Sequence, residues 1–570
     1  MKHYALAALF FVIVYLLPLG GRPMVTPDEF RYAEVPREMM VSGNYVQPHL
    51  MQMRYYEKPV LGYWMTAASF KAFGENAFAL RLPAALGAGL AALLVALLIQ
   101  QTLRDEKIAA LGATLYLACG LAYGIGTFAV LDSQLTGFVT GVSVTAFLAA
   151  VEPRFSRRKF ALLVICGVFA ALAFLTKGFL AFVVPALAML GFLIWERKWK
   201  EFLILPWIPL AVALAVIAPW ALAIHRADGD FWRYFVVVEH VQRFISSSGG
   251  QHSAPFWTLL PFLVVGVFPA GLLLSAAIPG IRAEGREFLR APLNRFCLCA
   301  IVLPFLFFSV SSGKLATYIL PCFPFLAVLG AGGVASYFRT GGSTRTFHIV
   351  MTVWGAVLLA AGIGILAIAF GDLIPPFSSK RIMVGLLGFC GILAGGLLLF
   401  SRRVMWRTRF YFFFFGIGLV IAVGGWAIPA ELMPGKMPEA DLRAFPAKLG
   451  FDPAKAVLIT HPSLIHAVGW VYRRSDARLL NSEGEFWYGI GRAEQSGETP
   501  IRMSPDELKA LLLKKNRPDV VFFFRGEKER SFPVRQENRS AVIGDIQAFV
   551  FPPEQEPSAG LAENRGMNRK

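Results

Sequence analysis

A series of thirteen long apolar runs constrains the fold of this chain more than any other feature of its sequence. Each run is long enough for a helix to cross about 30 Å of hydrocarbon. The runs cover residues 4–20, 82–101, 108–126, 131–151, 160–176, 179–195, 203–224, 256–280, 296–311, 317–338, 348–370, 382–400 and 410–429. Only 16% of the residues are charged, whereas soluble domains contain about 25%. The pattern predicts an α-helical polytopic membrane protein with about 13 transmembrane helices.

The basic residues of the loops lie between alternate apolar runs. Clusters at 154–159, 282–295 and 402–409 fall on one side of the membrane, and the positive-inside rule makes that side cytoplasmic. The longest loops of the other, outward-facing side are 21–81 and 225–255. This alternation accounts for the net charge of +18. Nucleic acid is not indicated as a partner, because no basic stretch carries the interleaved stacking aromatics of a single-strand binding site.

The tail beyond residue 430 has a different character and faces outward. Ser504 and Glu507 form a capping box with Pro505 between them, which predicts a helix through Lys515. The other predicted elements are strands at 456–460, 519–524 and 541–551 and a helix at 463–473. The sequence therefore predicts a transmembrane domain over 1–430, a periplasmic α/β domain over 431–551 and a disordered tail over 552–570.

Six cysteines all lie in or beside apolar runs and lack the spacing of metal ligands. They are Cys119, Cys166, Cys297, Cys299, Cys322 and Cys390. We interpret them as small buried hydrophobic side chains, with no disulfide or zinc framework.

The first outer loop is the most informative region for function. Charged and apolar residues alternate over 29–40, which is typical of a short helix on the membrane surface. A second interfacial helix is predicted at 55–70. It begins in the motif R-Y-Y-E-K-P-V-L-G-Y-W, where tyrosine and tryptophan anchor at headgroup depth. Glu57 and Lys58 would lie at that depth, where Lys58 can pair with a phosphate. This arrangement indicates an anionic lipid ligand.

Single polar residues of this kind also have plain structural explanations. Asp132 can cap the helix that starts beside it, and Lys177 and Lys314 can extend their ammonium groups to the membrane surface. The functional explanation depends on convergence, because acids and bases from several turns are all predicted at one membrane face. Ionisable groups at membrane depth are costly unless they have a function.

Several long motifs occur in the order found in one known family. They include P-D-E-F-R-Y-A-E-V-P-R-E-M, R-Y-Y-E-K-P-V-L-G-Y-W, T-K-G-F-L-A and S-S-G-K-L-A-T-Y-I-L. The chain resembles the lipid A 4-amino-4-deoxy-L-arabinose transferases of Gram-negative bacteria. These are membrane glycosyltransferases of the GT-C class, related to the protein O-mannosyltransferases. The match covers the membrane region and weakens from Lys455 onward.

The resemblance implies transfer of aminoarabinose from undecaprenyl phosphate to a lipid A phosphate, at the periplasmic face of the bacterial inner membrane. The modified lipid A would resist polymyxin and other cationic peptides. The implied partners are the lipid-linked sugar, lipid A and membrane lipids, and we expect a monomer. One alternative keeps the fold but transfers galactosamine, galacturonate or mannose, to lipid A or to protein. The least favoured alternative is a flippase for polyprenyl-linked sugars, which would place polar residues at the bilayer midplane.

The resemblance implies that Asp28 is the catalytic-site aspartate and that Lys58, Arg243 and Tyr318 bind the carrier phosphate, with Arg31 and Tyr55 nearby. The convergence of polar residues at one membrane face adds Glu57 and Asp132 as candidates for the catalytic site. It also adds Lys314 as a candidate ligand of the carrier phosphate. Glu57 and His240 are candidate ligands of a zinc ion. Because one glutamate and one histidine make an incomplete zinc site, we expect that the reaction requires no cofactor.

Overall fold

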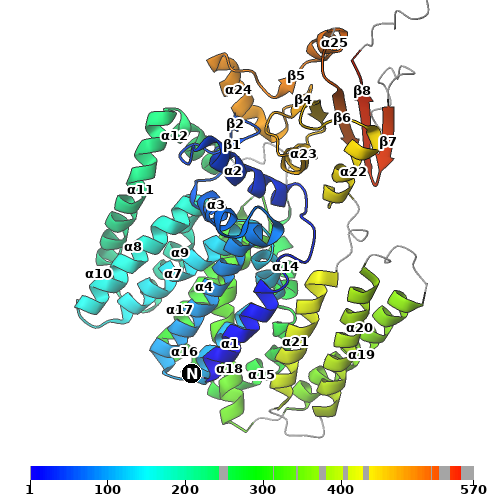
Figure 1. Cartoon of the computed structure of the whole chain (residues 1–570). Helices are drawn as coiled ribbons and strands as arrows, with labels where there is room; N and C mark the ends of the chain where they lie inside the picture. The colour runs from blue at the N-terminus through cyan, green and yellow to red at the C-terminus, as the bar shows by residue number, and fades with distance from the viewer. Residues whose placement is uncertain are drawn as a thin grey trace, which may run out of the picture. The chain divides into compact units, whose positions relative to one another are not determined.

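The computed structural model describes residues 2–242, 254–311, 313–341, 344–371, 380–401, 408–427, 435–514, 516–525 and 539–553. The chain divides into two compact units (Figure 1). Unit 1 comprises 1–23, 42–48 and 56–432, and unit 2 comprises 24–41, 49–55 and 433–570. The break near residue 432 is close to the predicted domain boundary. The assignment of 24–41 and 49–55 to the C-terminal unit was not anticipated.

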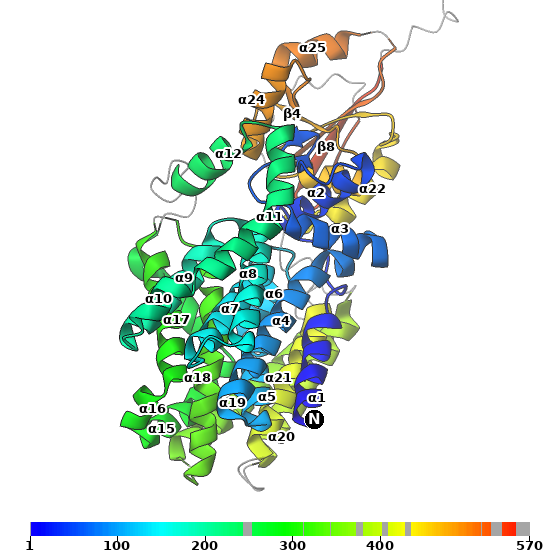
Figure 2. The ribbon, with the colours of Figure 1, turned by 90° about the vertical axis from the view of Figure 1, so that its left-hand side faces the viewer.

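Unit 1 is built from helices. They are α1 (Lys2–Phe11), η1 (Val12–Leu16), α3 (Leu61–Phe73), α4 (Ala77–Leu103), α5 (Glu106–Leu117), α6 (Gly120–Gly126), α7 (Asp132–Val151), α8 (Arg157–Lys177), α9 (Leu180–Trp195), α10 (Trp199–Ile204), α11 (Trp207–Ala227), α12 (Phe231–Arg233), η2 (Tyr234–Gln242), η3 (Phe256–Thr258), α14 (Leu259–Val267), η4 (Ala270–Leu273), α15 (Leu274–Glu284), α16 (Arg286–Arg290), α17 (Pro292–Val310), η5 (Ala316–Cys322), α18 (Phe323–Arg339), α19 (Arg345–Phe370), α20 (Arg381–Phe400) and α21 (Thr408–Ala427). The helices α19, α20 and α21 pack together in chain order. Figure 1 shows all three, and Figure 2 shows α20 and α21 from another side.

Nine helices in the described part of the chain are long and apolar enough to cross a membrane. They coincide with nine of the thirteen predicted spans. Three further predicted spans contain shorter apolar helices, at Lys2–Leu16, Leu180–Trp195 and Phe256–Val267. The remaining one, 108–126, is divided between α5 and α6. The chain is therefore a helical multi-span membrane protein, as predicted.

Two of the predicted spans are broken, and their breaks meet. The 108–126 segment breaks at Cys119, and the 256–280 segment breaks between α14 and η4. Cys119 and Pro269 form an antiparallel bridge, and the Gly120 N–H donates to the Phe268 carbonyl at 2.7 Å. A Cβ at Gly120 would lie 2.6 Å from that oxygen, so the approach requires glycine. Each break thus satisfies backbone groups that hydrocarbon would leave unpaired.

The helix α7 is largely buried and packs closely on α4. Gly87 and Gly137 make this approach possible, because a Cβ at either position would lie 2.7 Å from backbone atoms of the facing helix. The Ser133 hydroxyl donates to the Ala84 carbonyl at 2.7 Å. These contacts hold the N-terminus of α7, which carries Asp132.

Unit 2 is a mixed α/β domain. Its elements are α2 (Asp28–Ser42), β1 (His49–Leu50), β2 (Met53–Arg54), α22 (Glu439–Leu449), β3 (Val457–Thr460), α23 (Ile465–Tyr472), β4 (Arg478–Leu480), η9 (Gly484–Phe486), α24 (Trp487–Ser496), β5 (Arg502–Met503), α25 (Pro505–Leu513), β6 (Val520–Arg525), β7 (Arg539–Ile543) and β8 (Ile546–Phe551). The sheet order is β5-β4-β3-β6-β8-β7. The strands β5, β4, β3 and β6 are parallel to one another, and β8 is antiparallel to both of its neighbours, β6 and β7.

Several predicted elements of unit 2 are confirmed. The strands β3 and β6, the helix α23 and the capping box of α25 lie where the sequence places them. The prediction of one strand over 541–551 is wrong, because Gly544 adopts a positive φ of 59° and turns the chain into the β7–β8 hairpin. The predicted tail 552–570 lies outside the described residues except for 552–553.

The first outer loop contributes α2 and the β1–β2 hairpin to unit 2. The Glu38 carboxyl group accepts the Met51 and Gln52 N–H groups at 2.6 and 3.0 Å. Both of these turn residues have positive φ, so the Glu38 side chain stabilises an unfavourable backbone conformation. The charged residues Glu34 and Arg37 pair with each other and are buried. The helix predicted over 29–40 therefore exists, but its charged residues are not solvated as a surface helix would require.

Candidate active site

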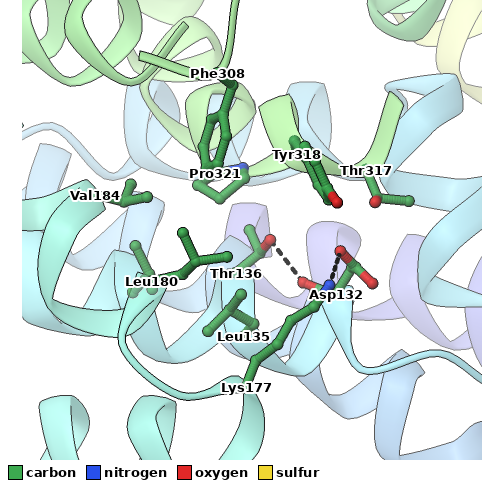
Figure 3. Close-up of a pocket in the computed structure, with 11 residues that line it drawn as sticks. Asp132, Leu135, Thr136, Lys177, Leu180, Val184, Phe308, Thr317, Tyr318 and Pro321 are labelled. Carbon is green, nitrogen blue, oxygen red and sulfur yellow. Dashed lines mark hydrogen bonds and ion pairs between the residues drawn. The ribbon is translucent and has the colours of Figure 1, made fainter. Parts of the chain in front are cut away.

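A pocket of unit 1 lies where α7, α8 and η5 meet (Figure 3). Asp132 is the first residue of α7, and Lys177 is the last residue of α8. Lys177 Nζ lies 2.6 Å from Asp132 Oδ1. A carboxylate at a helix N-terminus and an ammonium at a helix C-terminus are each stabilised by the helix dipole. The dipoles of α7 and α8 therefore stabilise both charges of this ion pair.

This contact replaces the structural explanations considered for both residues. The N-cap of α7 is Leu131, and no side-chain capping hydrogen bond is made there. Asp132 instead pairs with Lys177, and its backbone carbonyl accepts the Thr136 hydroxyl at 2.8 Å. Lys177 likewise pairs with a carboxylate, with its ammonium 5.9 Å from the ring centre of Tyr318.

The pocket has a polar end and an apolar wall. Figure 3 shows the ion pair on one side, facing Tyr318 and Thr317. The apolar wall consists of Leu135, Val139, Leu180, Val184, Phe308 and Pro321. The cavity itself is small, about 10 Å³, which is about the space of one water molecule.

Lys58 lies between acidic side chains in the loop before α3. Its ammonium donates to the Glu57 carbonyl at 2.8 Å, and the carboxylates of Glu239 and Glu57 lie 3.8 and 4.0 Å away. The Tyr234 hydroxyl donates to the other oxygen of Glu239 at 2.9 Å. The helix predicted over 55–70 corresponds to α3, which begins only at Leu61. Glu57 and Lys58 therefore lie in the loop before the helix and not within it. Arg243 lies outside the described residues.

Lys314 is buried against backbone oxygens. Its ammonium donates to the carbonyls of Ser311 and Ala254 at 2.6 and 2.9 Å. Ser311 is the C-cap of α17, where lysine side chains often satisfy unpaired carbonyls. The described contacts of Lys314 are therefore those of a helix cap.

The zinc ligands suggested by the family resemblance do not form a metal site among the described residues. No group of three or more His, Cys, Asp or Glu side chains comes together there. His240 Nδ1 lies 2.7 Å from the Phe235 carbonyl, and Nε2 accepts the Phe179 N–H at 3.4 Å. Both ring nitrogens thus face backbone groups in the part of the chain that the structure describes. We derive no catalytic step through a metal.

A second set of predicted site residues lies in unit 2. Arg31 pairs with Asp28 on the same helix and with Glu485, whose carboxylate is 2.6 Å away. Tyr55 donates to Glu485 at 2.8 Å, and His466 Nε2 lies 2.6 Å from its other oxygen. Burial alone would raise the pKa of the Glu485 carboxyl, but His466, Arg31 and Tyr55 together hold that pKa well below its usual range.

The structure thus sorts the predicted residues into two groups. Asp132 and Tyr318 line one pocket of unit 1, and Lys58 and Glu57 lie together in the loop before α3. Asp28, Arg31 and Tyr55 belong to unit 2. Sequence analysis missed Glu239, Glu485 and His466. Glu485 and His466 follow two strands of the sheet, a position at which α/β domains often place functional side chains.

The comparisons with known proteins identify the class of this protein, the integral-membrane glycosyltransferases that use lipid-linked sugars. Residues 1–235 match the family model described as dolichyl-phosphate-mannose-protein mannosyltransferase. The chain is 36% identical over 493 residues to the undecaprenyl phosphate-α-4-amino-4-deoxy-L-arabinose arabinosyl transferase of Pectobacterium atrosepticum, covering 85% of this chain and 86% of that one. It is 35% identical over 532 residues to the enzyme of the same name from Shewanella sediminis, covering 92% and 94%.

The chain belongs to this family of undecaprenyl phosphate-aminoarabinose arabinosyl transferases. The fold agrees with the crystal structure of ArnT from Cupriavidus metallidurans bound to undecaprenyl phosphate. The TM-score is 0.77 at 21% identity, over 96% of this chain and 97% of that one. The predicted fold class and the predicted enzyme class, a glycosyltransferase with a lipid-linked pentose donor, are confirmed.

Proposed function

We propose that this protein transfers 4-amino-4-deoxy-L-arabinose from undecaprenyl phosphate to a phosphate of lipid A. The observation that carries the proposal is the 36% identity over 85% of the chain to a transferase of that donor. The similarity covers 92% of the chain in a second relative, so it includes residues of both units. The reaction takes place at the periplasmic face of the inner membrane, and the product resists polymyxin and other cationic peptides.

The chemistry of the acceptor limits what the enzyme must do. A lipid A phosphate is already anionic at neutral pH, so its oxygen attacks without a general base. The new bond joins this oxygen to the anomeric carbon, and the bond from that carbon to the carrier phosphate breaks. Undecaprenyl phosphate leaves with the electron pair. Catalysis then depends on cations that stabilise the leaving phosphate and on orientation of the two lipids.

Particular residues can meet these needs. We assign Lys58, Arg243 and Tyr318 to the carrier phosphate, in agreement with the family resemblance. The apolar wall beside Tyr318 suits the first part of the prenyl chain. Asp28 carries a negative charge that can bind the sugar ammonium or the developing positive charge of the sugar ring. The carboxylates beside Lys58 also favour an amino sugar over galacturonate, which would require a further cation.

No cofactor is required in this scheme, since both substrates carry the charges that the reaction uses. The zinc ion at Glu57 and His240 stays a prediction of the family resemblance. The same fold could transfer galactosamine, galacturonate or mannose, because sugar specificity depends on a few contacts.

Mass spectrometry of lipid A separates these alternatives. Cells lacking the gene are compared with cells that express the protein or its Lys58→Ala variant. The proposal predicts a pentosamine increment that depends on the wild-type protein. A hexosamine or hexuronic acid increment would show that another sugar is transferred. Unchanged lipid A would contradict the assignment of lipid A as the acceptor.

A further inference from the structure

The carboxylate of Glu485 is the centre of a hydrogen-bond network in unit 2. One oxygen lies 2.6 Å from Arg31 and accepts the Tyr55 hydroxyl at 2.8 Å. The other oxygen lies 2.6 Å from His466 Nε2. The three partners come from α2, from the end of the β1–β2 hairpin and from α23. A single carboxylate therefore ties the first outer loop to the C-terminal α/β domain.

The position of Glu485 in the sheet is one at which α/β domains bind ligands. It follows the carboxyl end of β4, and His466 lies on the helix that follows β3. These parallel strands end at the same edge of the sheet. Along the chain, β4 and β5 are added on one side of β3, and β6 is then added on its other side. Ligands of doubly wound sheets bind at the carboxyl edge near such a change of side.

In this protein the residues at that edge contact the chain's own first outer loop. The Thr26 hydroxyl donates to the Ser463 carbonyl at 3.2 Å, just beyond β3. Thr26 also donates its N–H to the Lys436 carbonyl at 2.9 Å. Two residues later α2 begins with Asp28, and Arg31 follows one turn on. The α/β domain thus holds the start of α2 much as a related domain would hold a ligand.

Arg31 connects this edge to Asp28. One guanidinium nitrogen, Nη1, pairs with Glu485, and the other, Nη2, pairs with Asp28. The guanidinium is planar and rigid, so two partners on different nitrogens fix its orientation. The surroundings strengthen the contacts of Glu485, since His466 and Tyr55 are almost fully buried. The Asp28 carboxylate is partly exposed, as a group that meets substrate must be. Moving Glu485 would leave Asp28 with a mobile counterion.

We infer that Glu485 is a positioning residue of the transferase, which acts through Arg31 to orient the Asp28 carboxylate. The inference rests on the proposed function, in which Asp28 acts on the sugar. It gives the C-terminal α/β domain a direct part in the reaction. A purely structural Glu485 would stabilise unit 2 and leave the turnover of folded protein unchanged.

The test uses the full-length protein in detergent, with undecaprenyl phosphate-aminoarabinose as donor and lipid A as acceptor. Glu485→Gln keeps the size of the side chain but removes the charge that orients Arg31. We expect kcat to fall about 10- to 100-fold, as for loss of a residue that orients a catalytic group. KM for the donor should stay within about twofold, because orientation is lost rather than binding.

The matched control is Glu483→Gln. Glu483 lies two residues earlier in the same loop and pairs with Arg502. We expect its kcat to equal that of the wild type. The thermal unfolding midpoint of each variant shows whether it is folded. If Glu485→Gln does not fold, Tyr55→Phe removes one hydrogen bond to the same carboxylate, and its kcat must then fall without a change in the midpoint.

A double-mutant cycle identifies the route through Arg31. Arg31→Lys keeps the positive charge but loses the planar fork that reaches both carboxylates. If Glu485 acts through Arg31, Glu485→Gln should add little to the loss already caused by Arg31→Lys. Fully additive losses would overturn the inference, as would wild-type kcat in the folded Glu485→Gln variant. Failure of the wild-type protein to transfer the pentosamine would instead contradict the proposed function.

Discussion

The two units of this protein each place an acid against a base from a distant segment, but in different ways. In unit 1, Asp132 and Lys177 form one ion pair between the ends of two neighbouring helices, 45 residues apart. In unit 2, Arg31 and Glu485 are 454 residues apart and belong to a network that includes Asp28, Tyr55 and His466. The Asp132 carboxylate makes one ion pair in a pocket, whereas the Glu485 carboxylate makes several contacts around it.

The difference follows from the surroundings of each pair. Helix ends supply part of the stabilisation in unit 1, because the dipoles of α7 and α8 favour the two charges. The edge of a parallel sheet in unit 2 presents loops instead, and these must be tied down by side chains. We therefore expect substitutions in unit 1 to lower the transfer rate most when they remove a charge that binds substrate. Substitutions in unit 2 should lower it most when they disturb the hydrogen bonds around Glu485.

The largest effect is expected for Lys58→Ala in unit 1. Removal of a cation that stabilises the leaving phosphate should reduce the transfer rate about 10²- to 10³-fold. The rate is measured with purified protein and the lipid-linked donor. Lys71→Ala is the control, since Lys71 lies on α3 and its ammonium is 5.1 Å from the ring centre of Tyr45. Similar rates in both variants would count against the phosphate clamp.

A smaller effect is expected for Asp132→Asn. The substitution leaves Lys177 largely buried without a counterion, which should cost about 3 kcal/mol of stability. The thermal unfolding midpoint in detergent should fall. It should recover when Lys177→Met is added, since loss of both charges is nearly neutral.

The ion pair at the other end of α8 provides a matched control. Lys159 and Glu201 also lie 2.6 Å apart. Glu201→Gln should lower the midpoint in the same way but leave the transfer rate of folded protein unchanged. Equal effects of Asp132→Asn and Glu201→Gln on that rate would show that Asp132 has no part in the transfer reaction.

The pH dependence of stability is a test of unit 2. Burial and the neighbouring Glu34 raise the pKa of Glu38 to about 8. Above its ordinary pKa and below the raised one, the folded protein holds a proton that the unfolded chain has released. Stability should therefore fall as pH rises, by about 1–2 kcal/mol between about pH 6 and pH 7.5.

Glu38→Gln should remove this slope, as measured by the unfolding midpoint at the two pH values. Glu483→Gln serves again as the control, because its side chain is exposed and pairs at the surface. An unchanged slope in Glu38→Gln would show that another group titrates.

The smallest effect is expected for Ser504→Ala. Ser504 accepts the Glu507 N–H at 3.1 Å, and Glu507 accepts the Ser504 N–H at 2.7 Å. Loss of this cap should cost about 1 kcal/mol and leave the transfer rate unchanged. A large loss of activity would mean that α25 contributes to the reaction.

Much of the fold could be predicted because its signals are local. Apolar runs identified the helices, and Ser504 with Glu507 identified the start of α25. The β7–β8 hairpin was missed because 541–551 is apolar on both sides of Gly544, so only the turn shows the division. The short strands β4 and β5 have two or three residues each, too few for a periodic pattern.

The candidate site was predicted less completely. Asp132, Lys58 and Tyr318 stand out as polar residues beside apolar runs. Lys314 stands out in the same way, yet its described partners are the carbonyls of Ser311 and Ala254. Glu485 has no such signal, because a glutamate in a polar loop is ordinary.

The sequence by itself determined that this chain is a multi-span helical membrane protein with a C-terminal α/β domain, and its motifs indicated the family. Hydrophobicity and capping act over a few residues, so they can be read directly. Only the tertiary structure decided that Arg31 meets Glu485 and that Lys177 meets Asp132. Contacts between distant segments depend on how helices and strands pack, and no local pattern records that packing.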